Sequence, residues 1–319
     1  MKVVVTGASG FLGHNVLLRA PRTWDILAVY HETPGLERFV ADRQLTNVRP
    51  FHCDLRSAAD VAALRAACGS SVDAVLYLAA NGDPALSSER PAFDLERNTT
   101  ALVTFLEAFS VDHFVYVSSG AVYDGLRGLV TPATPVAPRL PYAIAKLASE
   151  QYVRFFAERR KSLGSFITVR FFGAYGPYEA ERKITTRWLR AMAAGQREFT
   201  VRGDGRNLID FMYVDDAVDG LLAVVQARGT SLTVDFASGA PVSIDAIVSA
   251  MAKTLAVEVT IRHEGIVAEY IEFQSADTAM RDRFGVVPSI PFDEGLRRLA
   301  AFLDHHAPAS SGAPGAHHR

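Results

Sequence analysis

The stretch that decides the fold is at the amino terminus, where residues 2–13 read KVVVTGASGFLG. A short β-branched run is followed directly by three glycines with the spacing Gly-x-x-Gly-x-x-Gly. Gly7 permits a tight turn, Gly10 lets the backbone approach a pyrophosphate, and Gly13 lets a following helix pack close to the strand. The free N–H groups at that helix start attract phosphate. The residues predicted to hold a dinucleotide here are Gly7, Ser9, Gly10, Phe11, Leu12 and Gly13.

Beyond the loop, short apolar runs alternate with segments of helical periodicity. The runs lack a clean period of two, which is typical of strands covered on both faces. Strand–helix alternation predicts right-handed crossovers and an α/β fold, a Rossmann doubly wound parallel sheet. The predicted strands are 2–6, 26–30, 48–53, 74–79, 113–118 and 166–172, and the predicted helices are 11–20, 58–68, 91–109 and 141–161.

After residue 173 the rhythm changes to helices mixed with short strands. Helices are expected near 181–194, 215–226 and 293–303, with strands at 198–201, 233–236 and 257–261. This half predicts a smaller C-terminal α/β substrate lobe on the open end of the sheet. We therefore divide the chain into a dinucleotide-binding domain, 1–173, to which later segments return, a substrate lobe, 174–306, and a flexible tail, 307–319.

The composition excludes several classes of protein. The chain has 319 residues, of which 49% are hydrophobic and 21% are charged, and its net charge is −2. That charge argues against nucleic-acid binding. Two cysteines and no long apolar run favour a cytoplasmic protein without a membrane anchor. Paired histidines in the tail, such as His317-His318, are interpreted as solvated residues, so no metal site is predicted.

The ends of the second and third strands bear on the choice of cofactor. An acidic residue at the end of the second strand would bind the adenosine ribose and repel a 2′-phosphate. The chain has Tyr30-His31 there, with Arg38 further on, and no acid before Glu32. This pattern leans towards NADP over NAD, unless Glu32 turns inward. Asp54-Leu55, at the end of the third strand, is expected to touch the adenine edge.

Tyr142 and Lys146 form the predicted catalytic pair. Their i, i+4 spacing places both side chains on one face of a helix, one turn apart. A phenol has a pKa of about 10, which is too high for a base at neutral pH. A neighbouring ammonium and a positively charged nicotinamide favour the phenolate. Lys146 is also suited to hold the nicotinamide ribose. Ser119, at the end of the fifth strand, is expected to bind the same substrate oxygen.

With these residues in view, the chain resembles the extended short-chain dehydrogenases/reductases of the NAD-dependent epimerase/dehydratase family, which act mainly on nucleotide sugars. The resemblance runs through Tyr77-Leu78-Ala79-Ala80, Val117 to Tyr123, Tyr142 to Lys146, Arg170 to Pro177, and Tyr213 to Asp216. It implies that Ser119, Tyr142 and Lys146 are catalytic. It also implies that the cofactor is flanked by Leu78, Ala79, Ala80 and Phe172, and that Asn98 supports the nearby backbone.

The chain departs from the family pattern at four places. Family dehydratases have an Asp-Glu pair straight after the catalytic Ser or Thr, and this chain has Gly120-Ala121. A nucleotide-contacting Asn is replaced by Gly173, and an Arg by Ile209. Asp124 stands where Gly commonly follows the Val-Tyr pair. These departures argue against 4,6-dehydration and remove two common nucleotide contacts.

The resemblance implies a nucleotide-sugar substrate, whose diphosphate is usually bound by arginine. We expect the substrate to contact Asn81, Ser119, Gly120, Tyr142, Tyr178, Lys183, Arg202 and Arg206. The preferred reaction is 4-keto reduction of a keto-deoxysugar nucleotide, and the alternative is a C4 epimerase with tightly bound NAD. A hydroxysteroid-like dehydrogenase and a catalytically silent dinucleotide sensor remain open. Apolar surface on helices 91–109 and 141–161 predicts a homodimer.

Overall fold

The fold is built on a seven-stranded parallel sheet. A computed structural model describes residues 1–69, 71–266 and 271–306, so the predicted tail and its His317-His318 pair lie outside the described residues. The strand order is β12-β7-β5-β4-β1-β2-β3, with every pairing parallel. In that order the strands are Leu232–Phe236, Leu163–Phe171, Val111–Ser119, Ala74–Tyr77, Lys2–Thr6, Asp25–Tyr30 and Val48–His52.

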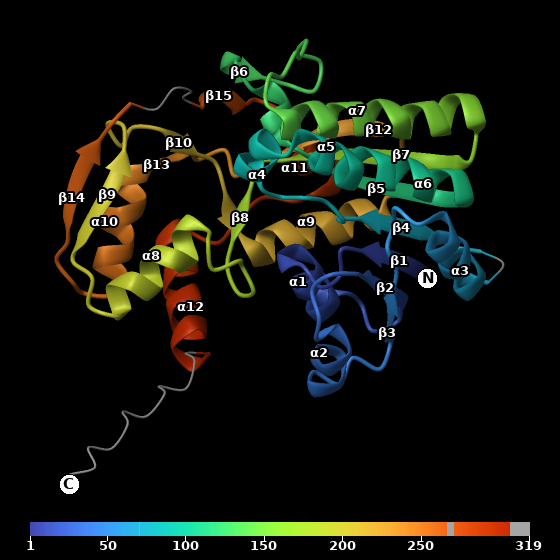
Figure 1. Ribbon diagram of the computed structural model, residues 1–319, viewed down its shortest axis with the longest axis horizontal. Coiled ribbons are helices and arrows are strands. Elements are labelled where there is room, and N and C mark those ends of the chain that lie inside the picture. Colours follow the sequence, from blue (N-terminus) through green and yellow to red (C-terminus); the bar gives the residue numbers. More distant parts are fainter. Residues whose placement is uncertain (70, 267–270, 307–319) are drawn as a thin grey trace, which may run out of the picture.

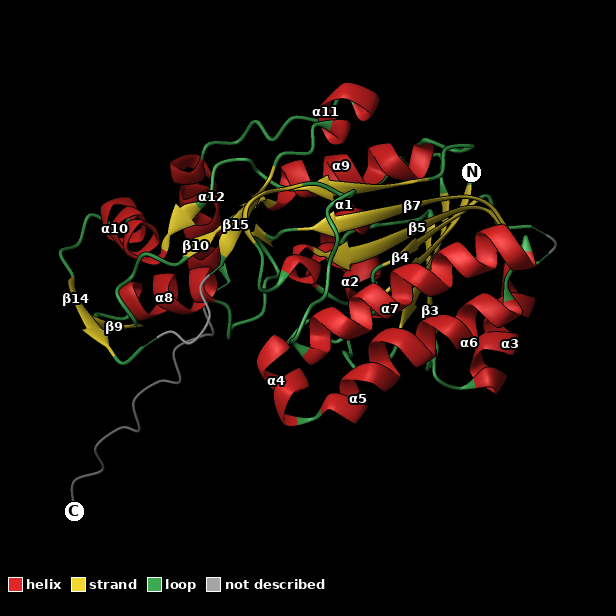
Figure 2. Cartoon of the chain, turned by 90° about the horizontal axis from the view of Figure 1, so that it is seen from above, coloured by secondary structure: helices red, strands yellow, loops and turns green. Residues whose placement is uncertain are grey.

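Helices cover both faces of the sheet (Figure 2). One face carries α1 (Phe11–Arg19) and α9 (Val214–Gln226), and the other carries α3 (Ala58–Cys68), α6 (Ala101–Ala108) and α7 (Pro141–Phe155). In β1, Val3 and Val5 pack in the first core while Val4 packs in the second. Burial on both faces explains why the strand sequences are continuously apolar. The Rossmann sheet predicted from the sequence is confirmed.

Two of the predicted helices are interrupted. Segment 91–109 consists of α5 (Pro91–Leu95), a π-helical turn (Glu96–Thr100) and α6, and segment 141–161 ends in a π-helical turn after α7 (Phe156–Arg160). Sequence periodicity also missed α2 (Leu36–Asp42), α4 (Pro84–Glu89), α10 (Ile244–Thr254) and α11 (Ala279–Phe284). Most of these are short or carry polar residues on their exposed sides. Periodicity is a weak signal over so few turns.

The lobe beside the sheet is made of small elements (Figure 1). Its helices are α8 (Ile184–Ala193), α10 and α12 (Phe292–His305). Strand β9 (Glu198–Arg202) pairs in parallel with β14 (Thr260–Glu264), which begins three residues later than predicted. The remaining short pairs are β8–β11 (Ala174–Tyr175 with Met212–Tyr213), β10–β13 (Leu208–Ile209 with Val242–Ser243) and β6–β15 (Arg127–Val130 with Glu272–Ser275).

The lobe is tied back to the sheet domain by segments late in the chain. Strand β12 forms the edge of the large sheet, and α9 packs against α1. Arg19 of α1 donates to both carboxylate oxygens of Asp219 of α9, the shorter contact being 2.6 Å. Within the described ranges, no helix is long and apolar enough to cross a bilayer.

Candidate active site

The glycine loop has the geometry that phosphate binding requires. Gly7 has φ of +68°, and a Cβ there would lie 2.8 Å from the backbone nitrogen of Ala79. A Cβ on Gly13 would lie 2.5 Å from the carbonyl oxygen of Gly7. No side chain caps the amino terminus of α1, and its first turn holds no acidic residue. The start of α1 is therefore an uncapped set of N–H donors suited to an anion.

A cleft opens in front of this loop, at the carboxyl ends of β1, β2, β3 and β4. Its volume is about 240 Å³, and it is open to solvent on one side. The sheet order reverses between β1 and β4, which is where open α/β sheets bind dinucleotides. Of the predicted cofactor residues, the cleft is lined by Gly7, Ser9, Gly10, Tyr30, His31, Asp54, Leu55, Leu78, Ala79 and Ala80.

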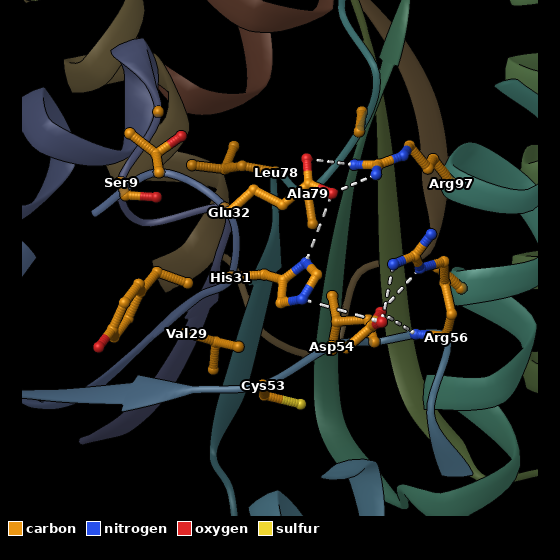
Figure 3. Close-up of a pocket in the computed structure, with 17 residues that line it drawn as sticks. Ser9, Val29, His31, Glu32, Cys53, Asp54, Arg56, Leu78, Ala79 and Arg97 are labelled. Carbon is orange, nitrogen blue, oxygen red and sulfur yellow. Dashed lines mark hydrogen bonds and ion pairs between the residues drawn. The ribbon is translucent and has the colours of Figure 1, made fainter. Parts of the chain in front are cut away.

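Ion pairs cross the part of this cleft at the ends of β2 and β3, which we call the adenosine end. Figure 3 shows Arg97 reaching Glu32 and Arg56 reaching Asp54, with His31 between the two carboxylates. Arg97 donates to Glu32 at 2.7 Å, and Arg56 donates to Asp54 at 2.8 Å. Hydrogen bonding from Arg56 lowers the pKa of Asp54 to about 2, and Arg97 lowers the pKa of Glu32. Both carboxylates are therefore ionised at neutral pH.

The predicted catalytic residues come together further along the carboxyl edge of the sheet, where β5 ends and α7 begins. We call this part the catalytic end. Ser119 ends β5, and Tyr142 and Lys146 lie in the first two turns of α7. The Ser119 hydroxyl is a hydrogen-bonding neighbour of the Tyr142 phenol. The Lys146 ammonium lies 5.9 Å from the centre of the Tyr142 ring and donates to the Val117 carbonyl at 2.9 Å. The fold thus brings a serine hydroxyl and a buried lysine close to the Tyr142 phenol.

Burial shapes the chemistry of this pair. Lys146 is only 4% exposed, and desolvation lowers its pKa to about 8. Burial raises the pKa of Tyr142, which the Ser119 hydroxyl opposes. Without further positive charge nearby, the phenol therefore stays protonated at neutral pH. A cationic nicotinamide at this site would move the balance towards the phenolate.

A buried polar network supports the site from behind. Arg170 of β7 donates to Glu150 of α7 at 2.8 Å, and both side chains are almost fully buried. The same carboxylate accepts from the Ser118 hydroxyl at 2.6 Å. Arg170 also donates to the Tyr123 hydroxyl at 2.9 Å, and Tyr123 donates to Asp235. The network joins β5, α7, β7 and β12 directly beneath the catalytic residues.

Several predicted binding residues do not line the cleft. Phe11, Leu12 and Gly13 lie in the first turn of α1, which packs close to the glycine loop. The Phe172 ring lies against Gly120. Arg38 lies on the outside of α2, with its side chain 87% exposed and paired with Asp42 at 3.4 Å. Arg38 was predicted to bind the cofactor. Its position differs because α2, which the sequence analysis did not predict, directs the side chain into solvent. Asn98 accepts from the backbone nitrogen of Asn81 at 2.7 Å.

The predicted substrate residues are scattered. Tyr178 was expected in the pocket wall, but its ring packs against His14, Phe39 and Phe302, and its hydroxyl accepts from Arg43 at 2.9 Å. Its backbone φ of +68° turns it that way. Arg202 and Arg206 are exposed in the lobe, and Arg206 faces Asp204. Lys183 is also exposed, with Asp83 and Glu179 as charged neighbours.

Some residues of the site were missed by sequence reasoning. Arg56 directly follows the Asp54-Leu55 pair, so its place in the cleft was within reach of the strand-end argument. Arg97 comes from the π-helical turn after α5, and nothing in its local sequence points to β2. Asp94 is a buried carboxylate in the first turn of the predicted helix 91–109, where an acid is expected on the outer face. Only the packing of α5 reveals it.

Known proteins match this chain along most of its length. The description "NAD dependent epimerase/dehydratase family" fits residues 3–234. An uncharacterized UDP-glucose epimerase, YtcB, of Bacillus subtilis is 28% identical over 250 residues, which are 70% of this chain and 72% of that protein. The UDP-glucose 4-epimerase of Mycolicibacterium smegmatis is 25% identical over 317 residues, which are 95% of this chain and 98% of that protein.

Solved structures share the fold. The structure of MoeE5 in complex with UDP-glucose and NAD has a TM-score of 0.83 and 24% identity, and the match covers 97% of this chain and all of that one, 100%. UDP-glucose 4-epimerase of Thermotoga maritima with UDP-glucose also has a TM-score of 0.83, with 21% identity over 97% of this chain. The glycine loop, the cleft and the family match lead to one conclusion. The chain belongs to the NAD dependent epimerase/dehydratase family.

Proposed function

We propose that the chain is a nucleotide-sugar C4 epimerase that keeps NAD bound through the reaction. The observation that carries the proposal is the cluster of Ser119, Tyr142 and Lys146 beside a dinucleotide cleft, with no second acid–base pair after Ser119. The relatives named above are epimerases by name. They favour epimerisation over the 4-keto reduction that we preferred from the sequence.

In this proposal the chain's own residues move the proton. Bound NAD supplies the chemistry of reversible hydride removal from the sugar carbon. Tyr142 takes the proton of the C4 hydroxyl, and Ser119 holds that oxygen by a hydrogen bond. Lys146 stabilises the phenolate as it forms. The same residues return the proton after the 4-keto sugar has turned over, so one acid–base group serves both halves of the reaction.

Dehydration is disfavoured by the space beside Ser119. A Cβ on Gly120 would lie 2.9 Å from the ring of Phe172, so this position has no room for an acidic side chain. Ala121 follows it in place of the second acid. An enzyme that removes water from the sugar needs an additional acid and base near the site. The chain lacks them at the positions that the family uses.

The cofactor that we propose is NAD. Glu32 turns towards the cleft, and Arg97 keeps it ionised. A carboxylate there can accept hydrogen bonds from ribose hydroxyls, whereas a 2′-phosphate would meet its negative charge. NAD is present in the structures of MoeE5 with UDP-glucose. The lean towards NADP drawn from Tyr30-His31 gains no support from any of these comparisons.

The substrate diphosphate requires a cation near the catalytic end. Gly173 and Ile209 stand where the family has an Asn and an Arg that contact the nucleotide. The positive charge of that Arg must therefore come from another residue. Arg182 and Lys183 precede α8, and Arg182 reaches Asp83 of the loop before α4 at 3.4 Å. That loop also holds Asn81, next to the cleft residue Ala80. We therefore assign the diphosphate to Arg182 and Lys183 rather than to Arg202 and Arg206, which are exposed on and after β9.

The test begins with the purified protein and no added cofactor. Heat or acid denaturation is expected to release NAD into solution, in amounts close to one per chain. The protein is then incubated with UDP-glucose, UDP-glucuronic acid, dTDP-glucose or GDP-mannose, and C4 epimers are sought by NMR. Tyr142→Phe serves as the control, with NAD content unchanged and product absent.

Other outcomes would replace the proposal. Net consumption of added NADPH with a 4-keto sugar nucleotide would identify the ketoreductase. Turnover of hydroxysteroids in place of sugar nucleotides would identify a dehydrogenase of apolar alcohols. Binding of NAD without turnover of either class would identify a sensor.

We also propose a homodimer. The apolar side chains of Ile144, Tyr152 and Phe155 are exposed along one side of α7, and Leu95 is exposed on the neighbouring α5. An exposed apolar stripe on packed helices is typical of a helix-bundle interface. Light scattering is expected to give twice the mass of 34.6 kDa. The double variant Tyr152→Glu, Phe155→Glu is expected to be monomeric, whereas a concentration-independent monomer of the natural chain contradicts the proposal.

A further inference from the structure

Asp94 is the residue of the site whose role the reaction scheme does not yet include. It lies in α5 with its side chain 0% exposed. Its Oδ1 atom accepts hydrogen bonds from the side-chain amides of Asn81 at 2.7 Å and Asn98 at 2.8 Å. Its Oδ2 atom is buried without a hydrogen-bond partner among the described residues. A buried carboxylate oxygen without a hydrogen-bond partner lowers the stability of the folded protein, so its presence calls for an electrostatic explanation.

The satisfied half of Asp94 holds the loop that follows β4. Asn98 accepts from the backbone nitrogen of Asn81 at 2.7 Å, while Asp94 holds the amides of both asparagines. Asn81 directly follows Ala79 and Ala80, which line the dinucleotide cleft. One carboxylate oxygen thus fixes the path of the cleft wall through two amide side chains. It also binds the amide of Asn81, the residue that we predicted to contact the substrate.

Asp94 also lies on a helix that packs against the catalytic helix. Helix α5 packs against α7, which carries Tyr142 and Lys146. The charge of Asp94 raises the pKa of Lys146 against the desolvation that lowers it, and it raises the pKa of Tyr142. Opposite charge favours the ammonium, and like charge disfavours the phenolate. Asp94 therefore favours the protonated form of both groups.

Other groups near the pair are already engaged. Glu150, on the same side of α7 as Lys146, is held by Arg170 and by the Ser118 hydroxyl. Tyr116 of β5 lies with its ring 5.1 Å from the Lys146 nitrogen, and burial raises its pKa well above the usual value, so it is neutral. Ser119 faces the Tyr142 phenol and carries no charge. Among the described residues, Asp94 is thus a buried carboxylate on the neighbouring helix with one oxygen that has no hydrogen-bond partner.

We propose that Asp94 is a positioning residue of the catalytic site, which holds the Asn81–Asn98 wall of the cleft with one oxygen and keeps Lys146 in its ammonium form with the other. The inference rests on the proposed roles of Tyr142 and Lys146. Lys146 enters the reaction charged, as stabilisation of a phenolate requires. The phenol stays protonated until a cationic nicotinamide is bound beside it.

The experiment compares Asp94→Asn with Asp94→Ala in the full-length protein. The asparagine keeps an oxygen for the two amides but removes the charge, whereas alanine removes both. Ionisation of Tyr142 is followed by tyrosinate absorbance, as the difference between each protein and its Tyr142→Phe counterpart. Protonation of Lys146 is followed by NMR titration of the side chains of the five lysines. Glu89→Gln, an exposed acid on α4, is the matched control.

A direction of change is expected for the pKa of Lys146, for the pKa of Tyr142 and for the melting temperature. In Asp94→Asn the pKa of Lys146 falls below its wild-type value of about 8, and the pKa of Tyr142 falls too. Thermal stability stays close to that of the wild type. In Asp94→Ala both values fall and the melting temperature drops as well. Glu89→Gln leaves all three measurements unchanged.

Two results would overturn the inference. If both pKa values in Asp94→Asn equal those of the wild type, the charge of Asp94 does not act on the pair. If Asp94→Asn loses as much stability as Asp94→Ala while the pKa values stay fixed, the residue is merely structural. Both measurements are made without substrate, so they separate this inference from the proposed function. The latter fails when the wild-type protein neither contains nor binds NAD.

Discussion

The two ends of the carboxyl edge of the sheet hold similar residues in opposite environments. At the adenosine end, Glu32 and Asp54 are partly exposed, and each is matched by an arginine. At the catalytic end, Asp94 and Lys146 are buried, and neither is fully compensated. Matched charges in contact with water contribute little to stability. Unmatched charges in the interior shift the pKa of their neighbours, so this end is suited to proton transfer.

The largest effect is expected at the catalytic end. Tyr142→Phe removes the hydroxyl that exchanges the proton and is expected to lower turnover by about 100- to 10,000-fold. The NAD content of the purified protein should stay the same, because the adenosine end is untouched. Epimer formation is measured with the sugar nucleotide that the wild type accepts. Unchanged turnover would remove Tyr142 from the mechanism and with it the contrast between the two ends.

The next effect concerns stability. Arg170→Met leaves Glu150 buried without its cation, so the free energy of unfolding is expected to fall by about 3–5 kcal/mol. Arg56→Met breaks a partly exposed pair at the other end, and the expected loss is about 0–1 kcal/mol. Urea denaturation of both variants measures the difference directly. Equal losses would mean that burial does not separate the two ends.

A smaller effect is expected on cofactor choice. Glu32→Gln removes the charge that a 2′-phosphate would meet and releases Arg97 to bind it. Affinity for NADP is expected to rise about tenfold, as for one like charge removed at close range. Affinity for NAD changes less. Isothermal titration of apoprotein with both dinucleotides gives the ratio, and Glu37→Gln on α2 is the control. An unaltered ratio would show that Glu32 does not face the adenosine ribose.

The smallest effect is expected from Arg38→Ala. The side chain is exposed on α2 and, within the described ranges, pairs with Asp42 of the same helix. Its removal is expected to change the affinity for either dinucleotide less than about twofold, since such surface pairs contribute little. The same titration measures it. A selective loss of NADP affinity would restore the role that the sequence assigned to Arg38.

Much of the site was within reach of sequence reasoning. The glycine spacing after β1 and the strand-end pair Asp54-Leu55 predicted residues that line the cleft. The i, i+4 spacing of Tyr142 and Lys146 placed both on one face of α7. These predictions depend on contacts within a few residues of the chain, where backbone geometry leaves few choices.

Other features depended on elements that are distant in the sequence. Glu32 and Arg97 are 65 residues apart. Asp94 and Lys146 lie on neighbouring helices because α5 packs on α7. Tyr178 turned out to pack between α1, α2 and α12 because a left-handed backbone conformation directs its ring there.

The chain alone therefore determined the sheet, the glycine loop and the placement of Tyr142 and Lys146 on one helix, because strand propensity, glycine spacing and helical periodicity are local properties. Tertiary structure decided which charges meet and which are kept from water. Those outcomes depend on burial and on distances between separate elements, and electrostatic energies in a protein vary steeply with both.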